Sequence, residues 1–259
     1  MQGLVVLAVA FLVRFPGNDD RVPAPVASRV AQSAYDSTPL EMLRSPQFYL
    51  LYVMFVMIAT GLLFMTAQVA PLSKDYGIAK APLHVIGFVV MALPFAPIVD
   101  NVLNGGSRVI FGGLSDRIGR EVTMALAFAL EAFGLIGLLF VAHNPWGFVV
   151  CAGATFIASG EICSLFPATC TDLYGRKFAT VNCGLLYTAK GTAALIVPIA
   201  SQIRDTTGTW SSVVTVLVAF NIVTALLAVF VLKPMRERRL AAEGQRPAPA
   251  GAAAAAAVR

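Results

Sequence analysis

The feature that most constrains this chain is a series of apolar runs, each long enough to cross a lipid bilayer. A transmembrane helix needs about 20 mostly apolar residues to span the hydrocarbon core. Only 13% of the residues are charged, whereas soluble domains usually carry about 25%. The sequence therefore predicts an all-α membrane protein. Six apolar segments stand out, at roughly 47–69, 84–111, 122–142, 146–169, 182–203 and 209–232.

The remaining segments are too short or too polar to cross a bilayer. Residues 1–13 offer only a partial span, so we interpret them as a truncated transmembrane helix. Residues 14–46 are polar and contain several prolines, which predicts a cytoplasmic connecting loop. Residues 233–259 are basic and then rich in alanine and proline, which predicts a disordered cytoplasmic tail. The six-helix transmembrane bundle is predicted to occupy residues 47–232.

Lysine and arginine are distributed unevenly between the two sides of the predicted bundle. The loop 14–46, the turns 112–121 and 170–181 and the tail together hold fourteen, while the alternate connections hold three. Loops rich in these residues face the cytoplasm. We therefore expect a multi-pass protein of a bacterial inner (plasma) membrane whose C-terminus is cytoplasmic.

Several function classes fit the sequence poorly. The net charge of +5 comes from residues between the apolar runs, without the aromatic and basic pattern of nucleic-acid binders. The four cysteines form no CxxC pair, and His84 and His143 are far apart, so no metal site is predicted. The loops show no catalytic constellation, and we expect neither an enzyme nor a cofactor.

Six full helices that follow a long cytoplasmic loop match the second half of a twelve-helix carrier. Such carriers are built from two six-helix repeats, with substrate bound near the middle of the membrane between them. The predicted partners are therefore the lipid bilayer and an N-terminal six-helix half that is missing from this chain. A channel subunit, a membrane enzyme and a sensor anchor are the other six-helix designs considered.

The segment GGLSDRIGRE at 112–121 contains closely spaced glycines and charges. It resembles the signature loop of the major facilitator superfamily, which has a glycine, then Asp-Arg, then Gly-Arg. The resemblance implies a conformational switch loop, in which Gly112 allows close helix approach and Gly119 a tight turn. Asp116 would accept hydrogen bonds from the opposite half, or from Arg117 and Arg120, as a latch that breaks when the halves rock. The alternative is an ordinary basic loop.

Two further features qualify this motif. Glu121 stands where the family usually has a third basic residue, which implies a weaker latch. A fainter echo, DLYGRK at 172–177, occupies the next predicted cytoplasmic turn.

Charged residues also lie within the apolar segments, where an ion is costly. Asn101, Asn104 and Arg108 share one helix face, and Lys190 lies at similar depth with Tyr187 on its face. Two cations that face one cavity predict an anionic ligand. The alternative is internal neutralisation, since three carboxylates that could act in ion pairs or as proton sites lie in the same segments: Asp100, Glu131 and Glu161.

A closer resemblance rests on NGGSR…GGLSDRIGR together with YTAKGTAA. These stretches are similar to the oxalate/formate antiporter family, of which the chain covers the C-terminal half. The resemblance implies that Arg108 and Lys190 bind a small carboxylate and exchange it by alternating access. Ser159 and Cys163 stand where that family's oxalate exchanger has aromatic residues, which implies a different or larger carboxylate, with Tyr187 supplying part of the wall.

Two other functions remain open at this stage. The first is a proton-coupled monocarboxylate carrier, in which Glu131 or Glu161 takes up the proton. The second is a non-transporting, truncated membrane protein, because half a carrier cannot enclose a site alone.

Overall fold

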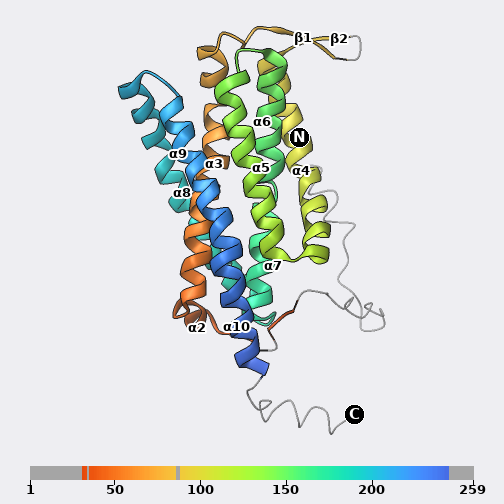
Figure 1. Cartoon of the computed structure of the whole chain (residues 1–259), viewed down its shortest axis with the longest axis vertical. Coiled ribbons are helices and arrows are strands. Elements are labelled where there is room, and N and C mark those ends of the chain that lie inside the picture. The colour runs from red at the N-terminus through yellow and green to blue at the C-terminus, as the bar shows by residue number, and fades with distance from the viewer. Residues whose placement is uncertain (1–30, 34, 86–87, 245–259) are drawn as a thin grey trace, which may run out of the picture.

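The computed structural model describes residues 31–33, 35–85 and 88–244, which form an elongated helical bundle (Figure 1). The predicted truncated helix at 1–13, most of the 14–46 loop and residues 245–259 lie outside the described residues. In chain order the elements are α2 (Pro39–Leu43), α3 (Pro46–Asp75), β1 (Pro82–Val85), β2 (Phe88–Met91), α4 (Ala92–Ile118), α5 (Arg120–Val141), α6 (Pro145–Ser159), α7 (Ile162–Tyr174), α8 (Ala179–Thr207), α9 (Ser211–Leu227), η1 (Ala228–Leu232) and α10 (Lys233–Gly244).

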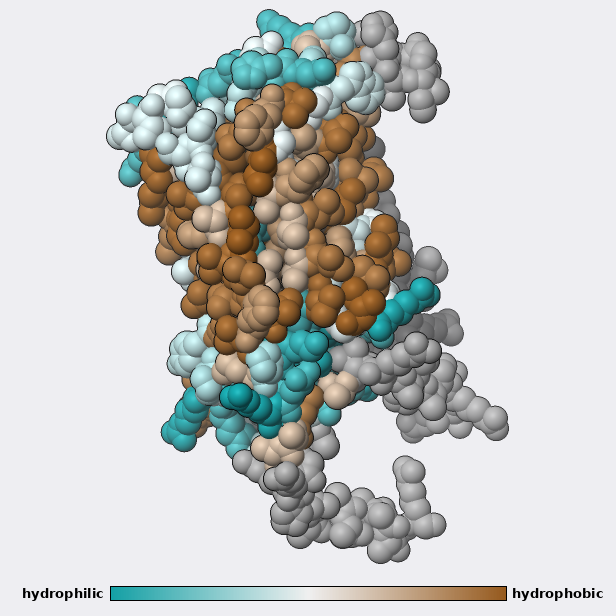
Figure 2. Space-filling view, viewed as in Figure 1, coloured by the Kyte–Doolittle hydropathy of each residue, from teal (hydrophilic) through white to brown (hydrophobic). Residues whose placement is uncertain are grey.

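The surface has the character of a protein that spans a membrane. On the face seen in Figure 2, apolar residues cover the middle of the bundle and polar residues gather at its two ends. Five stretches of the described helices are long and apolar enough to cross a bilayer. The long helix α4 is not among them, because its NVLNGGSR segment is polar. The predicted all-α membrane fold is confirmed.

The two ends of the bundle are named here by the elements that they carry (Figure 1). The hairpin end carries the antiparallel β1–β2 hairpin and the end of α3. The α10 end carries α2, α10 and the turns that join α4 to α5 and α7 to α8. The excess of lysine and arginine predicts that the α10 end faces the cytoplasm.

The expected helix at 84–111 is wrong over its first residues. The chain forms β1 and β2 there, paired with Leu83 opposite Val90, and α4 begins only at Ala92. β-branched residues such as Val89 and Val90 favour extended structure. Pro94 lies in the first turn of α4, where proline does not cost a helical hydrogen bond.

Helical structure extends further at the α10 end than the sequence predicts. The expected turn at 112–121 shrinks to Gly119, whose φ of 97° lies in the region that favours glycine. The expected disordered tail is helical as α10 over Lys233–Gly244, continuous with η1. In the opposite sense, the expected single helix at 146–169 is broken at Gly160 and Glu161, between α6 and α7.

The interior is divided into two apolar clusters by buried polar side chains. One cluster lies toward the α10 end, around Phe55, Phe128 and Phe166. The other lies toward the hairpin end, around Phe64 and Phe148. Along the helices, buried polar residues lie between the positions that belong to the two clusters. They are called here the polar layer: Thr60, Glu131, Ser159, Glu161, Asn221 and Thr224.

Ion pairs hold the α10 end together. Arg120, at the start of α5, places Nε 2.9 Å from Asp172 of α7 and Nη1 2.9 Å from Asp116 of α4. Its Nη1 also donates to the hydroxyl of Ser115. The GGLSDRIGRE segment is therefore tied to its DLYGRK echo by a buried pair that the sequence did not predict.

Glu121 has a different partner. Its Oε1 lies 2.5 Å from Nε of Arg236 in α10, and both side chains are buried. Arg236 also donates through Nη1 to the carbonyl of Ala31 at 3.3 Å. Glu121, at a position where the family usually has a basic residue, therefore forms a second buried ion pair at this end. This pair joins α10 to α5.

The residues before α3 form a strap along the α10 end, defined here as 35–45. Oδ1 of Asp36 accepts from the backbone amides of Arg176 (2.9 Å) and Lys177 (3.0 Å) in the α7–α8 turn. A Cβ at Gly175, where φ is 82°, would meet the Tyr35 carbonyl at 2.8 Å. Glycine is therefore required at this contact.

The strap also shapes its own short helix. Thr38 caps α2 and forms a reciprocal capping box with Glu41. Hydrogen bonds from the Thr38 amide and hydroxyl and from the Tyr35 hydroxyl hold the pKa of Glu41 below its ordinary value. Asn182 of α8 donates to the carbonyl of Ser37 at 3.1 Å, so strap and bundle are joined from both sides.

The Glu121–Arg236 pair yields a stability prediction. Arg236→Gln strands the buried Glu121 carboxylate and should lower the free energy of unfolding by about 3 kcal/mol, the lower end of the range for a broken buried pair. Unfolding in detergent, followed by tryptophan fluorescence, measures the change. Arg238→Gln, an exposed change on the same helix, should have little effect. If Glu121→Gln added to Arg236→Gln restored no stability, the pair would not be the cause.

The orientation can be tested by cysteine labelling. Lys80, near the hairpin end, and Arg117, at the α10 end, are both exposed and suit labelling. In a cysteine-free background, Lys80→Cys should react with an impermeant maleimide on intact cells. Arg117→Cys should react only after permeabilisation. The opposite pattern would reverse the predicted orientation.

Candidate functional site

Arg108 lies on α4 with an exposed side chain. Its Nη2 donates to Oδ1 of Asn104, one turn earlier, at 3.2 Å. Asn101 is exposed on the same face and donates to the carbonyl of Pro97 at 2.7 Å. The predicted row of Asn101, Asn104 and Arg108 therefore lies on one face, and Asn104 orients the guanidinium.

Lys190 lies on α8 and is half-buried. Tyr187, one turn earlier, donates its hydroxyl to the carbonyl of Cys163 on α7 at 3.3 Å. The ring of Tyr187 also packs edge-to-face on Phe55, with centroids 5.4 Å apart. Tyr187 is thus positioned from both sides beside the turn of α8 that presents Lys190.

The helix α7 and the break before it join the two parts of the site. A Cβ at Gly160 would meet the carbonyl of Asn104 at 2.6 Å, so the break packs directly on α4 near Arg108. Three residues later, Cys163 receives the hydroxyl of Tyr187. The Arg108 charge also lies close enough to the Tyr187 hydroxyl to act on it electrostatically. Arg108 and Tyr187 therefore share one region of the bundle.

Neither cation has an ion-pair partner within the described part of the chain. The ion pairs found there involve Arg120, Arg204 and Arg236, and none involves Arg108 or Lys190. Internal neutralisation by Asp100, Glu131 or Glu161 is therefore not observed among these residues. Asp100 is half-buried on α4, while Glu131 and Glu161 are fully buried in the polar layer.

The faces of α4 and α8 that carry the two cations are open. A Cβ placed on their glycines would find nothing within 4 Å, and large apolar residues nearby, such as Val109 and Leu195, are more than 70% exposed. At Gly112, expected to allow close helix approach, an added Cβ would therefore meet no atom within 4 Å among the described residues. The open glycines are Gly105, Gly106, Gly112 and Gly113 on α4, and Gly184 and Gly191 on α8.

Ser159 and Cys163, which the sequence predicts to line the carboxylate site, lie in different environments. Ser159 is fully buried in the polar layer and donates to the carbonyl of Thr155 at 2.8 Å. Cys163 is half-buried and faces Tyr187 through its carbonyl. Only Cys163 therefore lies beside the predicted binding residues.

The predicted switch residues lie at the α10 end, away from this site. Asp116 and Arg120 pair across one helical turn, and Gly119 makes the turn between α4 and α5. Arg117 is exposed and has no ion pair among the described residues. The sequence did not predict the partners Asp172 and Arg236, which are distant in the chain and meet only in the folded bundle.

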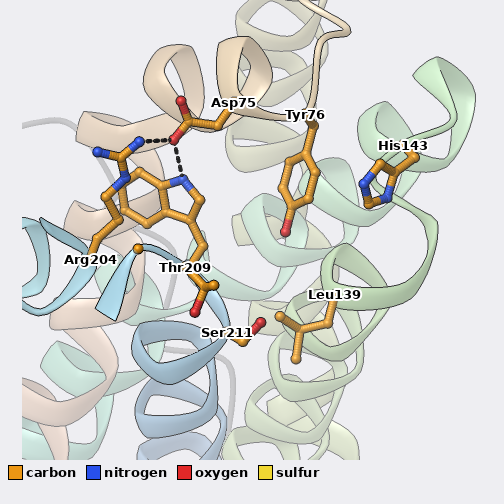
Figure 3. Close-up of a pocket in the computed structure, with 9 residues that line it drawn as sticks. Asp75, Tyr76, Leu139, His143, Arg204, Thr209 and Ser211 are labelled. Atoms are coloured by element: carbon orange, nitrogen blue, oxygen red, sulfur yellow. Dashed lines mark hydrogen bonds and ion pairs between the residues drawn. The ribbon is translucent and has the colours of Figure 1, made fainter. Parts of the chain in front are cut away.

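A polar pocket of about 440 Å³ opens at the hairpin end (Figure 3). The Asp75 carboxylate accepts from Nη2 of Arg204 at 2.6 Å and from Nε1 of Trp210 at 2.7 Å. On the opposite side Tyr76 and His143 meet edge-to-face, with centroids 5.0 Å apart. Burial and the Asp75 charge raise the pKa of the Tyr76 phenol.

The chemistry of this pocket differs from that around Arg108 and Lys190. The Arg204 charge is already matched by Asp75, and the pair joins the ends of α3 and α8 to the start of α9. The pocket therefore closes the hairpin end and offers no free cation to an anion. Among the described residues, no group of three or more His, Cys, Asp or Glu side chains could hold a metal ion.

Three curated proteins are similar to the chain. The oxalate:formate antiporter of Oxalobacter formigenes is 27% identical over 91% of the chain. An uncharacterized MFS-type transporter, YhjX, of Escherichia coli strain K12 is 26% identical over 62% of the chain. An uncharacterized 38 kDa protein in the 23S RNA operon of Thermoproteus tenax is 28% identical over 61%.

The chain spans about half the length of the first of these relatives and less of the others: the matches cover 53%, 38% and 37% of their lengths. The sequence model of the Major Facilitator Superfamily matches residues 102–258, which is more than half of the chain. The match includes α5 to α10 and most of α4, with both cations of the candidate site. The chain therefore belongs to the Major Facilitator Superfamily, as an integral membrane protein similar to the oxalate:formate antiporter.

Proposed function

We propose that this chain is the C-terminal half of a carrier that exchanges small carboxylate anions, of the oxalate or formate type, by alternating access. The observation that carries the proposal is the pair of cations, Arg108 and Lys190, without an ion-pair partner among the described residues. The first of the similar proteins is named an oxalate:formate antiporter, which supports this class of substrate.

Electrostatics explains why an anion suits this site. A cation in the membrane interior costs between ~3 and more than 10 kcal/mol unless it is hydrated or paired. A carboxylate ligand supplies the missing charge. The planar guanidinium of Arg108, oriented by Asn104, can hold one carboxylate through two hydrogen bonds. The compact ammonium of Lys190 would attract a second carboxylate as a point charge.

The open faces of α4 and α8 provide room for the other half of the carrier. Apolar residues and glycines are exposed on these two faces. The helices α3, α5 and α9, by contrast, are packed against other helices of the chain. Small residues allow close helix packing within a membrane. An N-terminal six-helix half that covers these faces would enclose the anion near the middle of the bilayer.

The ion pairs at the α10 end would then act as the conformational switch. Asp116 is exposed although it pairs with Arg120, so its carboxylate is also accessible to the other half. The buried pairs Arg120–Asp172 and Glu121–Arg236 hold this end of the bundle rigid. The switch would therefore work by making and breaking contacts of Asp116, while the buried pairs stay intact.

The proposal predicts the effect of neutralising each cation in the full-length carrier. Lys190→Gln and Arg108→Gln should each reduce carboxylate exchange about 10- to 100-fold, as expected for the loss of a charged hydrogen bond of about 1.5–3 kcal/mol. Counterflow of labelled oxalate and formate in proteoliposomes measures the loss. Membrane abundance should hardly change, because neither cation has an ion-pair partner to strand among the described residues.

Two further variants sharpen this test. Lys80→Gln removes an exposed lysine at the hairpin end and should leave exchange intact. Lys190→Arg should restore only part of the activity, because a planar fork does not replace a compact ammonium. Abundant Lys190→Gln or Arg108→Gln carrier with normal exchange would refute the proposed binding site.

A further inference from the structure

The polar layer contains two carboxylates that the proposed anion site does not use. Glu131 of α5 and Glu161, at the break before α7, are both fully buried. None of their four carboxylate oxygens has a hydrogen-bond partner in the described part of the chain. The two groups lie close enough to act on each other electrostatically. Such a pair cannot remain doubly ionised in an apolar interior without a compensating positive charge.

The described surroundings of Glu131 are polar but uncharged apart from Glu161. The carboxylate of Glu131 occupies space left by Gly61 of α3, because a Cβ at Gly61 would collide with Oε1 of Glu131. The Nδ2 atom of Asn221 lies 3.8 Å from the same Cβ position, so the amide flanks the carboxylate. That amide nitrogen donates to the carbonyl of Leu217 at 3.1 Å, and the buried Oδ1 of Asn221 has no partner. The amide of Asn221 therefore lies beside the carboxylate through its nitrogen, while its oxygen is a further buried acceptor without a partner among the described residues.

Glu161 connects this cluster to the anion site. The preceding residue, Gly160, packs against Asn104 and Ser107 of α4, beside Arg108. Two residues later, the carbonyl of Cys163 accepts from Tyr187 of α8. Glu161 is thus held between the segments that present the two proposed binding cations. In transporters, breaks in transmembrane helices commonly lie at substrate and coupling-ion sites.

In the part of the chain that the structure describes, no buried positive charge lies beside the pair. Among titratable groups, Glu161 faces Glu131 from α5 and Cys163 from α7. Arg108 of α4 and Tyr187 of α8 lie on the segments next to it. From α3, α6 and α9 the cluster receives Gly61, Ser159 and Asn221, which do not titrate. A shared proton would remove one of the two negative charges and would let one carboxyl group donate a hydrogen bond to a neighbouring acceptor.

We propose that Glu131 and Glu161 form a proton-binding site, and that its proton controls how strongly the neighbouring Arg108–Lys190 site binds carboxylates. The second part rests on the proposed function, whereas the first does not. Release of the proton adds a negative charge beside the anion site and weakens carboxylate binding. Affinity for carboxylates therefore falls as the pH rises through the titration of the pair.

Infrared spectroscopy of this chain in lipid nanodiscs tests the proton site without any transport assay. A protonated carboxyl group has a carbonyl stretching band separate from that of a carboxylate, and the band shifts in D₂O. At neutral pH and without sodium, we expect such a band, which Glu131→Gln and Glu161→Gln each remove or shift. Glu237→Gln, which changes an exposed carboxylate of α10, is the control and should leave the band unchanged.

Three infrared results would overturn the proton site. The first is the absence of a protonated carboxyl band in the unaltered chain, which does not depend on the folding of any variant. The second is a band that persists unchanged in both glutamate variants. The third is a band that sodium ions abolish at constant pH, which would assign the cluster to a metal cation.

Binding of labelled oxalate to the full-length carrier tests the second part. Raising the pH through the infrared titration should weaken binding about 5- to 150-fold, the usual range of coupling between two sites. In Glu161→Gln the affinity should no longer depend on pH over this range. Oxalate binding with the same pH dependence in both proteins would overturn control by the proton. Absence of oxalate and formate binding at any pH would instead refute the proposed function, while the infrared result still decides the proton site.

Discussion

An ionised side chain inside a membrane protein needs a partner of opposite charge, and this requirement organises the whole bundle. At the α10 end, Arg120 and Arg236 meet carboxylates of neighbouring helices and hold those helices together. At the hairpin end, Arg204 is matched by Asp75. At intermediate positions along α4, α5, α7 and α8, no such matching occurs among the described residues. The unmatched groups are therefore available for ligands, whereas the matched groups maintain the fold.

The unmatched charges are separated by sign. Both cations lie on the open helices α4 and α8, while the carboxylates of the pair lie in the closed interior of the polar layer. This separation would suit the proposed carrier, in which an anion enters from water while the core stays dry. The break at Gly160 brings the two regions together, because it packs on α4 and leads into the helix that contacts Tyr187. A small change at the break can thus affect both sides of the site.

The sequence predicts the membrane fold and one face of the candidate site, because both depend on local patterns. Hydropathy marks the spans, and helical spacing places Asn101, Asn104 and Arg108 together. The β1–β2 hairpin was missed because short apolar runs fit strand and helix equally well. The pairing of Glu121 with Arg236 was missed because it joins residues far apart in the chain. The burial of Glu131 and Glu161 likewise depends on how five helices pack.

The strap described above has a mechanical consequence for any rocking motion of the bundle. Its aspartate is fastened to two consecutive amides of the α7–α8 turn, and its carbonyl at Ser37 is held by Asn182. When α7 and α8 tilt, the strap must tilt with them, because these hydrogen bonds join it to α8 and to the turn between the two helices. A tilt of α7 and α8 would thereby reach residues 35–45 and the helix α3 that follows them.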